Sequence, residues 1–194
     1  MFGQTRAAWL TLVMAAVMPL RTFTQERPDA ASLLVAQRTA MASLAMMDGE
    51  WRGPAWTILP SGEKHTITQT ERIGPFLEGS VKVIEGRGYE TNGRVSFNAF
   101  GTISFEVAKH AYTMHSYALG SVGDFVLKPT PDGYVWEIPA GPSTIRYTAV
   151  IKNGAWQEVG DRISSGHEPV RFFEMTLTRV GDSTWPAAGA VPPK

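Results

Sequence analysis

Short segments rich in β-branched and aromatic residues, separated by tight-turn sequences, fill this chain from residue 50 to residue 180. Asn92-Gly93, Asp132-Gly133 and Asn153-Gly154 are typical two-residue hairpin turns, and Ser61-Gly62 and Gly141-Pro142 are further turn signals. The turns divide the region into ten predicted strands: 50–59, 64–73, 79–90, 94–106, 110–119, 122–128, 134–139, 143–152, 155–165 and 169–180. Because a long series of hairpins has exposed edges unless it closes, the pattern predicts an all-β fold, a single antiparallel up-and-down β-barrel.

One helix is predicted before the first strand. Asp29 follows Pro28 and can cap the first turn, and Gly49 is placed to end the helix. An apolar stripe is formed by Leu33, Leu34, Ala40, Met41, Leu44 and Met47. We therefore expect helix 29–47 to pack across one end of the barrel.

The first residues have the features of an export signal. Arg6 precedes 12 uncharged residues, 7–18, which are too few to span a bilayer, for which about 20 are needed. We divide the chain into a signal peptide (1–24), an N-terminal helix segment (25–48), the barrel domain (49–182) and a flexible tail (183–194). The expected location is secreted or periplasmic, without a membrane span once the signal is removed.

Composition excludes several classes of function. The chain has 18 basic and 18 acidic residues, whereas a nucleic-acid-binding protein needs a basic surplus, so nucleic acid is not an expected partner. The absence of cysteine rules out a disulfide scaffold and a thiolate nucleophile. Four histidines are scattered, at positions 65, 110, 115 and 167, so no metal site or other cofactor is expected.

The Asn153-Gly154 turn fixes the register of the strands on either side. It pairs Lys152 with Ala155 and Ala149 with Glu158, which directs Glu158 to the same side as Tyr147 and Trp156. Alternation in the other strands adds further inward side chains. The expected lumen residues are Tyr147, Trp156, Glu158, Arg162, Glu71, Phe173 and Met175.

An apolar lumen with a few polar groups is typical of a small-molecule site, and ten strands leave room for one. The first hypothesis is a carrier or sensor of a small apolar or amphipathic molecule, whose polar head contacts Tyr147, Glu158 and Arg162. The second is an isomerase or hydrolase with Glu158 as general base. The third is a cell-envelope interaction protein with a filled lumen. Inward charges can also be satisfied by a salt bridge or by water at the barrel rim.

Several motifs resemble those of lipocalins and other calycins. Gly49-Glu50-Trp51 is similar to the Gly-x-Trp that opens their first strand, and Arg179 occupies the place of their closing basic residue. The resemblance implies that Trp51 and Arg179 close one end through a cation–π contact. Together with the stretches 145–148, 156–160 and 173–179, these residues resemble exported bacterial lipocalin-like proteins, domain of unknown function 1579, a family whose function is open.

A more distant resemblance is to the haem-binding nitrobindins, whose Gly-x-Trp-x-Gly start is matched by Gly49, Trp51 and Gly53. Their proximal histidine is in one of the last two strands. This chain has Phe172, Phe173 and Glu174 there, and its nearest histidine, His167, lies in a loop. The departure disfavours haem.

Overall fold

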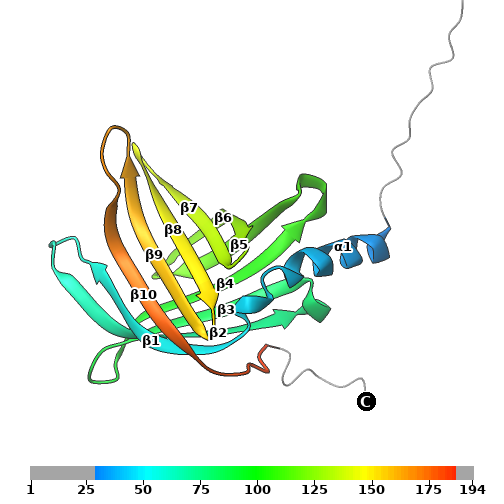
Figure 1. The fold of residues 1–194 in the computed structure, drawn as a ribbon, viewed down its shortest axis with the longest axis horizontal. Coiled ribbons are helices and arrows are strands. Elements are labelled where there is room, and N and C mark those ends of the chain that lie inside the picture. Colours follow the sequence, from blue (N-terminus) through cyan, green and yellow to red (C-terminus); the bar gives the residue numbers. More distant parts are fainter. Residues whose placement is uncertain (1–28, 187–194) are drawn as a thin grey trace, which may run out of the picture.

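The structure, a computed structural model, describes residues 29–186. Within them, ten strands form a closed barrel in which every neighbouring pair is antiparallel (Figure 1). The strands are β1 (Gly49–Ile58), β2 (Lys64–Phe76), β3 (Val81–Tyr89), β4 (Val95–Glu106), β5 (Ala111–Ala118), β6 (Ser121–Thr130), β7 (Gly133–Ala140), β8 (Ser143–Lys152), β9 (Ala155–Ser164) and β10 (Val170–Gly181). The predicted all-β up-and-down barrel is confirmed. The proposed signal peptide lies outside the described residues.

Each strand pairs with the strands before and after it in sequence, and β1 pairs with β10 to close the barrel. The pairing is uneven around the circumference. The ladder between β6 and β7 runs only from Leu127 to Thr130 on β6, opposite Gly133 to Trp136 on β7. The rest of these two strands, toward the β7–β8 turn, is unpaired along the edge they share.

Helix α1 (Ala30–Ala42) begins as predicted, with the Asp29 side chain accepting the backbone N–H of Ser32 at 2.8 Å. The expectation that the helix runs to residue 47, with Gly49 as the residue that ends it, is wrong. The helix ends at Ala42, and a 3₁₀ turn, η1 (Ala45–Met47), leads into β1. Gly49 is instead the first residue of β1, with a φ of +132°. A Cβ there would lie 2.9 Å from the Arg179 guanidinium group, so the position requires glycine for the close approach as well as for its backbone conformation.

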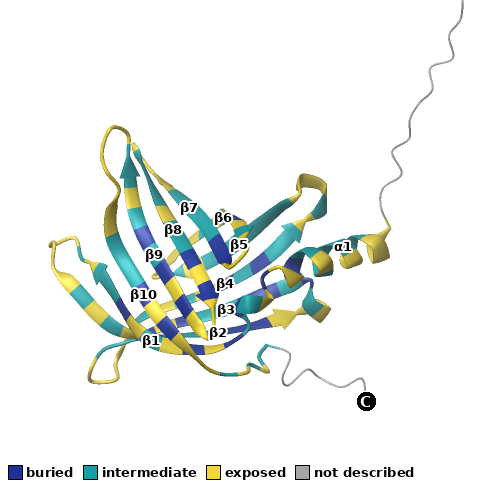
Figure 2. Cartoon of the chain, viewed as in Figure 1, coloured by how far each residue is buried: buried dark blue, intermediate teal, exposed yellow. Residues whose placement is uncertain are grey.

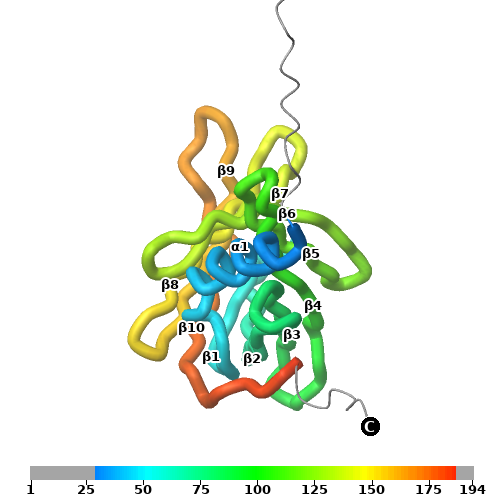
Figure 3. Tube along the Cα trace, turned by 90° about the vertical axis from the view of Figure 1, so that its right-hand side faces the viewer, coloured from blue at the N-terminus to red at the C-terminus, as the bar shows by residue number. Residues whose placement is uncertain are grey.

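The helix lies across one end of the barrel, as predicted (Figure 3). Two short 3₁₀ turns at this end, η2 (Leu77–Gly79) and η3 (Val107–Lys109), also contact it. The Tyr112 hydroxyl of β5 donates to the Ala40 carbonyl at 2.8 Å. Met41, Leu44 and Met47 are buried, whereas Leu34 is 40% exposed and does not belong to the packed stripe.

The apolar core fills the helix end of the barrel. Its buried members include Trp51, Ile73, Ile103, Leu127, Ile151, Trp156 and Leu177. Inward-facing apolar residues nearer the opposite end are only half-buried: Ile67, Phe125, Trp136, Ile145, Tyr147 and Phe173. Figure 2 shows this gradient from the α1 end to the exposed hairpins of the other end. The barrel is therefore closed at one end and accessible to solvent at the other.

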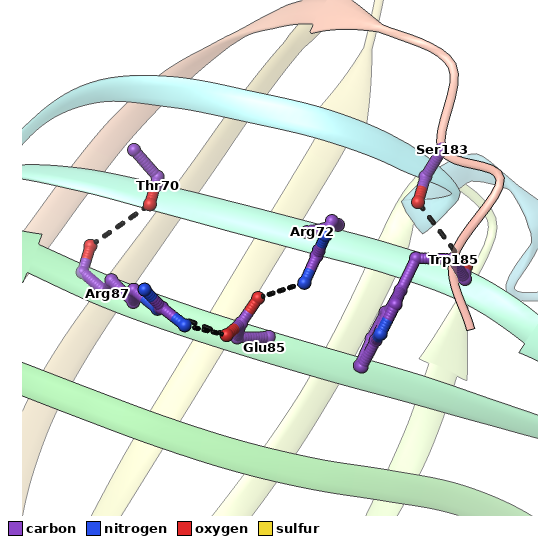
Figure 4. Close-up of polar contacts among 6 residues, drawn as sticks. All are labelled: Thr70, Arg72, Glu85, Arg87, Ser183 and Trp185. Carbon is purple, nitrogen blue, oxygen red and sulfur yellow. Dashed lines mark hydrogen bonds and ion pairs between the residues drawn. The ribbon is translucent and has the colours of Figure 1, made fainter. Parts of the chain in front are cut away.

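Residues 183–186 do not form a free tail, which corrects that part of the expected division. They follow β10 and pack on the outer wall of the barrel, where the centroid of the Trp185 ring lies 4.7 Å from the Arg72 guanidinium carbon (Figure 4). The Trp185 and Phe100 ring centroids are 6.4 Å apart. Gly74 permits this contact, because a Cβ there would collide with the Trp185 carbonyl oxygen. The remaining tail residues, 187–194, lie outside the described residues. No helix in the described part of the chain is both long enough and apolar enough to cross a membrane.

Candidate functional site

Glu158 is the centre of a buried polar cluster inside the barrel. The predicted pairing of Ala149 with Glu158 is confirmed, and Tyr134 of β7 pairs with Ala149 from the other side. Because the middle residue of this row is small, the Tyr134 hydroxyl reaches over it and donates to Glu158 Oε2 at 2.7 Å. Trp136 Nε1 donates to Glu158 Oε1 at 3.2 Å. Glu158 is only 6% exposed.

A second inward carboxylate, Glu71 of β2, belongs to the same cluster. Gln69 is buried on the same face and donates from Nε2 to Glu71 Oε1 at 2.7 Å. Gly86 of β3 pairs with Glu71, and a Cβ at Gly86 would lie 2.8 Å from that same oxygen. The glycine therefore leaves the space that the Glu71 carboxyl group occupies. We call Gln69, Glu71, Tyr134, Trp136 and Glu158 the lumen polar cluster.

Burial governs the protonation of this cluster. Burial raises the pKa of Glu71 to about 8, against the opposing effect of the Gln69 hydrogen bond and with a contribution from the charge of Glu158. Burial also raises the pKa of Glu158, although the hydrogen bonds from Tyr134 and Trp136 oppose the shift. The pKa of Tyr134 is raised well above its ordinary value, first by burial and then by Glu158. The coupling of Glu71 to Glu158 indicates that the two carboxyl groups share one electrostatic environment.

An aromatic wall lies on the open side of the cluster. The Tyr147 ring stacks on the Trp136 ring, with centroids 4.3 Å apart and planes at 9°. Phe172 and Phe173 contact Tyr147 edge-to-face, at 5.9 Å and 5.8 Å. Two consecutive residues of β10 reach the same ring because the register with β9 shifts between Arg171 and Phe173. Gly160 lies beneath them, and a Cβ there would be about 3 Å from all three neighbouring rings or side chains.

The other predicted lumen residues are in different places. Trp156 and Met175 are buried in the core next to the cluster, at 2% and 4% exposure. Arg162 shares the inward parity of Glu158, but it pairs with Ile145 and Val170 near the open end of the barrel and is exposed. It forms no hydrogen bond or ion pair with the described residues. Arg162 therefore lies nearer the open end than Glu158, and its contact with the polar head of a ligand stays a prediction.

Trp51 and Arg179 are both at the closed end, as expected, but their side chains do not make the expected contact. Trp51 is buried and pairs with Arg179 across the β1–β10 seam. No cation–π contact joins the two among the described residues. The Trp51 indole instead donates to the Met47 carbonyl at 2.9 Å, and Arg179 Nη2 donates to Asp182 at 2.6 Å and to the Asp48 carbonyl at 3.3 Å. Hydrogen bonding rather than a cation–π contact holds this end.

A separate hollow of about 340 Å³ lies over β1, β2 and β3, and its lining includes Arg52, Arg72, Glu85 and Arg87. Arg72 donates to Glu85 Oε2 at 2.7 Å, and Arg87 donates to Glu85 Oε1 at 3.1 Å (Figure 4). These hydrogen bonds outweigh the effect of partial burial and lower the pKa of Glu85. Because these charges are paired with one another, the lumen, whose carboxyl groups have no cationic partner in the described part of the chain, is the better candidate site.

Metal ligation has no support in the described part of the chain, where no three His, Asp or Glu side chains converge. His65 hydrogen-bonds Glu90 at 3.1 Å, and His115 contacts Asp124.

Four members of the site were not among the expected lumen residues: Gln69, Tyr134, Trp136 and Phe172. The Gly141-Pro142 turn could have revealed Tyr134 and Trp136, because pairing Ala140 with Ser143 brings Tyr134 opposite Ala149. No residue signal marks the register shift that turns Phe172 inward.

Comparisons with known proteins bear on the fold alone. No protein-family model matches the sequence, and no curated protein is similar to it. Among solved structures, the chain is similar to Rv2717c from M. tuberculosis, with a TM-score of 0.55 and 11% sequence identity over 73% of this chain and 97% of that one. That likeness supports a shared barrel architecture.

Proposed function

We propose that this barrel binds a small, largely apolar molecule in its lumen, with the lumen polar cluster contacting a polar group of that molecule. The observation that carries the proposal is the order of layers along the barrel axis. A packed core at the α1 end is followed by buried Glu158 and half-buried Glu71, and then by aromatic side chains that remain accessible. Such an arrangement gives an apolar site with a few polar groups at its base.

Two other hypotheses have weaker support. A general base must move a proton to and from a substrate, whereas the hydrogen bonds from Tyr134 and Trp136 hold the Glu158 carboxyl group in one position and leave each oxygen a further acceptor site, which suits binding. An interaction protein with a filled lumen would bury its inward aromatic residues, whereas Tyr147 and Phe173 are half-buried.

The exported lipocalin-like family suggested by the sequence motifs is compatible with a carrier, and we infer that residues 1–24 direct export. N-terminal sequencing of the protein from its natural host tests that inference: an intact Met1 would contradict it.

The binding proposal is tested with N-phenyl-1-naphthylamine, a weakly polar probe that fluoresces in apolar surroundings. We expect saturable binding to the wild-type protein. Phe173→Asn should weaken it by about tenfold or more, because a large aromatic contact is lost. Thr176→Asn is the matched control, since Thr176 is exposed on the outer face of the same strand. Absence of probe binding, or equal loss in both variants, would contradict the proposal. Native mass spectrometry of the purified protein then identifies any retained molecule.

A further inference from the structure

The two lumen carboxyl groups have no cationic partner among residues 29–186. Four basic side chains occupy inward positions of the described strands, and each is near an end of the barrel. Lys82 is ion-paired with Asp48, Arg179 is bonded to Asp182, and His65 is bonded to Glu90. The fourth, Arg162, is exposed near the open end. Burying ionised carboxyl groups without a partner is costly, and Glu71, with a pKa of about 8, holds its proton at pH 7 in the free protein. A ligand that brought a positive charge to this layer would stabilise the ionised form and release that proton.

The cluster also has one unused hydrogen-bond donor. Trp156 is 2% exposed, and its indole N–H is buried without a hydrogen-bond partner among the described residues. Trp156 is on the same inward face of β9 as Glu158, and its ring contacts the Tyr134 ring edge-to-face, with centroids 6.2 Å apart. A buried, unpartnered N–H is rare in folded proteins. A ligand atom that accepts a hydrogen bond at this point would satisfy it.

The wall above the cluster suits a cation as well. The rings of Trp136, Tyr147, Phe172 and Phe173 form a continuous aromatic surface next to Glu158. The faces of aromatic rings attract ammonium groups, and the attraction grows when the site excludes water. Apolar walls and carboxylates together therefore discriminate against anionic head groups.

From these three observations we infer that the ligand class is an amphipathic amine with a neighbouring oxygen acceptor, such as an amino alcohol on an apolar chain. The inference rests on the proposed lumen binding and specifies its head group. The ammonium group donates to Glu71 and Glu158, the oxygen accepts from the Trp156 indole N–H, and the chain lies along the aromatic wall toward the open end. No covalent step is involved.

Four probes with the same ten-carbon chain separate the contributions of the amine and the oxygen acceptor to binding. They are decan-1-amine, 2-aminodecan-1-ol, decan-1-ol and decanoate. Each is titrated at pH 7 against bound N-phenyl-1-naphthylamine. Decan-1-amine should bind about tenfold more tightly than decan-1-ol, because a charge-assisted hydrogen bond replaces a neutral one. The amino alcohol should bind more tightly still, and decanoate most weakly.

Two substitutions test the assigned contacts. Glu158→Gln should reduce the preference for decan-1-amine over decan-1-ol to less than about threefold, since one carboxylate is removed. Trp156→Phe should abolish the advantage of the amino alcohol over the simple amine. Glu85→Gln is the matched control, because Glu85 is on the outer face of β3 and should leave all preferences unchanged. If Glu158→Gln does not fold, Glu71→Gln serves in its place, because Glu71 is half-buried and faces the same lumen.

The possible outcomes distinguish this inference from the function on which it rests. Displacement by decan-1-ol as strong as by decan-1-amine, or preference for decanoate, would overturn the amine inference and leave lumen binding standing. Failure of N-phenyl-1-naphthylamine and of all four chains to bind would overturn both. An unchanged amine preference in both carboxyl variants would show that the carboxyl groups are not the contact.

Discussion

At the scale of single residues, the burial of Glu71 links protonation of the lumen to folding. Its pKa of about 8 in the folded protein lies above the ordinary value of 4.5. Between these values the folded state binds a proton that the unfolded state has lost, so the free energy of unfolding should be largest below about pH 4.5 and fall as the pH rises toward 8. The slope from this group is at most about 1.4 kcal/mol per pH unit.

Glu71→Gln should therefore flatten the decrease in stability between pH 5 and pH 8, measured by urea denaturation at several pH values. Glu158 contributes in the same direction, because its pKa is also raised, so part of the slope should remain. Glu85→Gln is the control. The pKa of Glu85 is lowered, so that group is ionised across this range in both states. An equally steep decrease in Glu71→Gln would contradict the prediction.

Trp51 is the residue on which the closed end most depends. Its indole is 2% exposed, contacts the Trp156 ring edge-to-face at 5.6 Å, and donates to Met47. Trp51→Ala should lower the free energy of unfolding by about 3–5 kcal/mol, the usual loss for a large buried aromatic residue. Trp56→Ala, on the outer face of the same strand, removes a Lys64 cation–π contact and should cost about 1 kcal/mol or less. Equal losses in chemical denaturation would contradict the assignment.

At the scale of elements, the hairpin turns made much of the fold predictable. Turn type sets the register of the two strands that it joins, so β8 has its predicted bounds and Glu158 its predicted partner. Alternation, however, gives only the face of a side chain and not its height along the barrel axis. Arg162 and Glu158 share a face but differ in height, which is why one is exposed and the other buried. The height depends on the stagger between strands, which no single strand encodes.

The end of α1 and the alternation in β10 were predicted wrongly for other reasons. Gly49 was expected to end the helix because glycine favours helix ends, but its left-handed φ serves the entry into β1. The register shift near Phe172 inserts one residue into strict alternation, and tertiary packing against Tyr147 and Gly160 determines where it falls.

The outer-wall contact of residues 183–186 depends on one glycine. In Gly74→Ala the added methyl group would collide with the Trp185 carbonyl, so the segment should leave the wall. Val83, which pairs with Gly74 and is buried, should then become more exposed. Hydrogen exchange of the Ser183–Trp185 amides should accelerate, while the strands keep their protection. Gly181→Ala is the control, because a Cβ there meets open space. Unchanged exchange in Gly74→Ala would contradict this account.

At the scale of the whole molecule, closure between β1 and β10 should make unfolding cooperative. Every strand is hydrogen-bonded on both sides in the barrel, so no strand can be lost without exposing its neighbours. We expect tryptophan fluorescence and far-ultraviolet circular dichroism to report one coincident transition in urea. Separate midpoints would indicate that part of the barrel unfolds independently.

Because the ladder between β6 and β7 is short, the open end of the barrel is not a complete ring of hydrogen-bonded strands. Beyond Leu127 on β6 and Trp136 on β7, no ladder bonds tie the two strands together. The open end can therefore widen between β6 and β7 without breaking a backbone hydrogen bond between these strands. Ligands of different width would then bind with a similar free-energy cost of widening the barrel, and the end of a long ligand chain would have room to pass between β6 and β7. In such a barrel the lumen polar cluster, which contacts the head group, would determine which ligand binds, and ligand width at the open end would matter less.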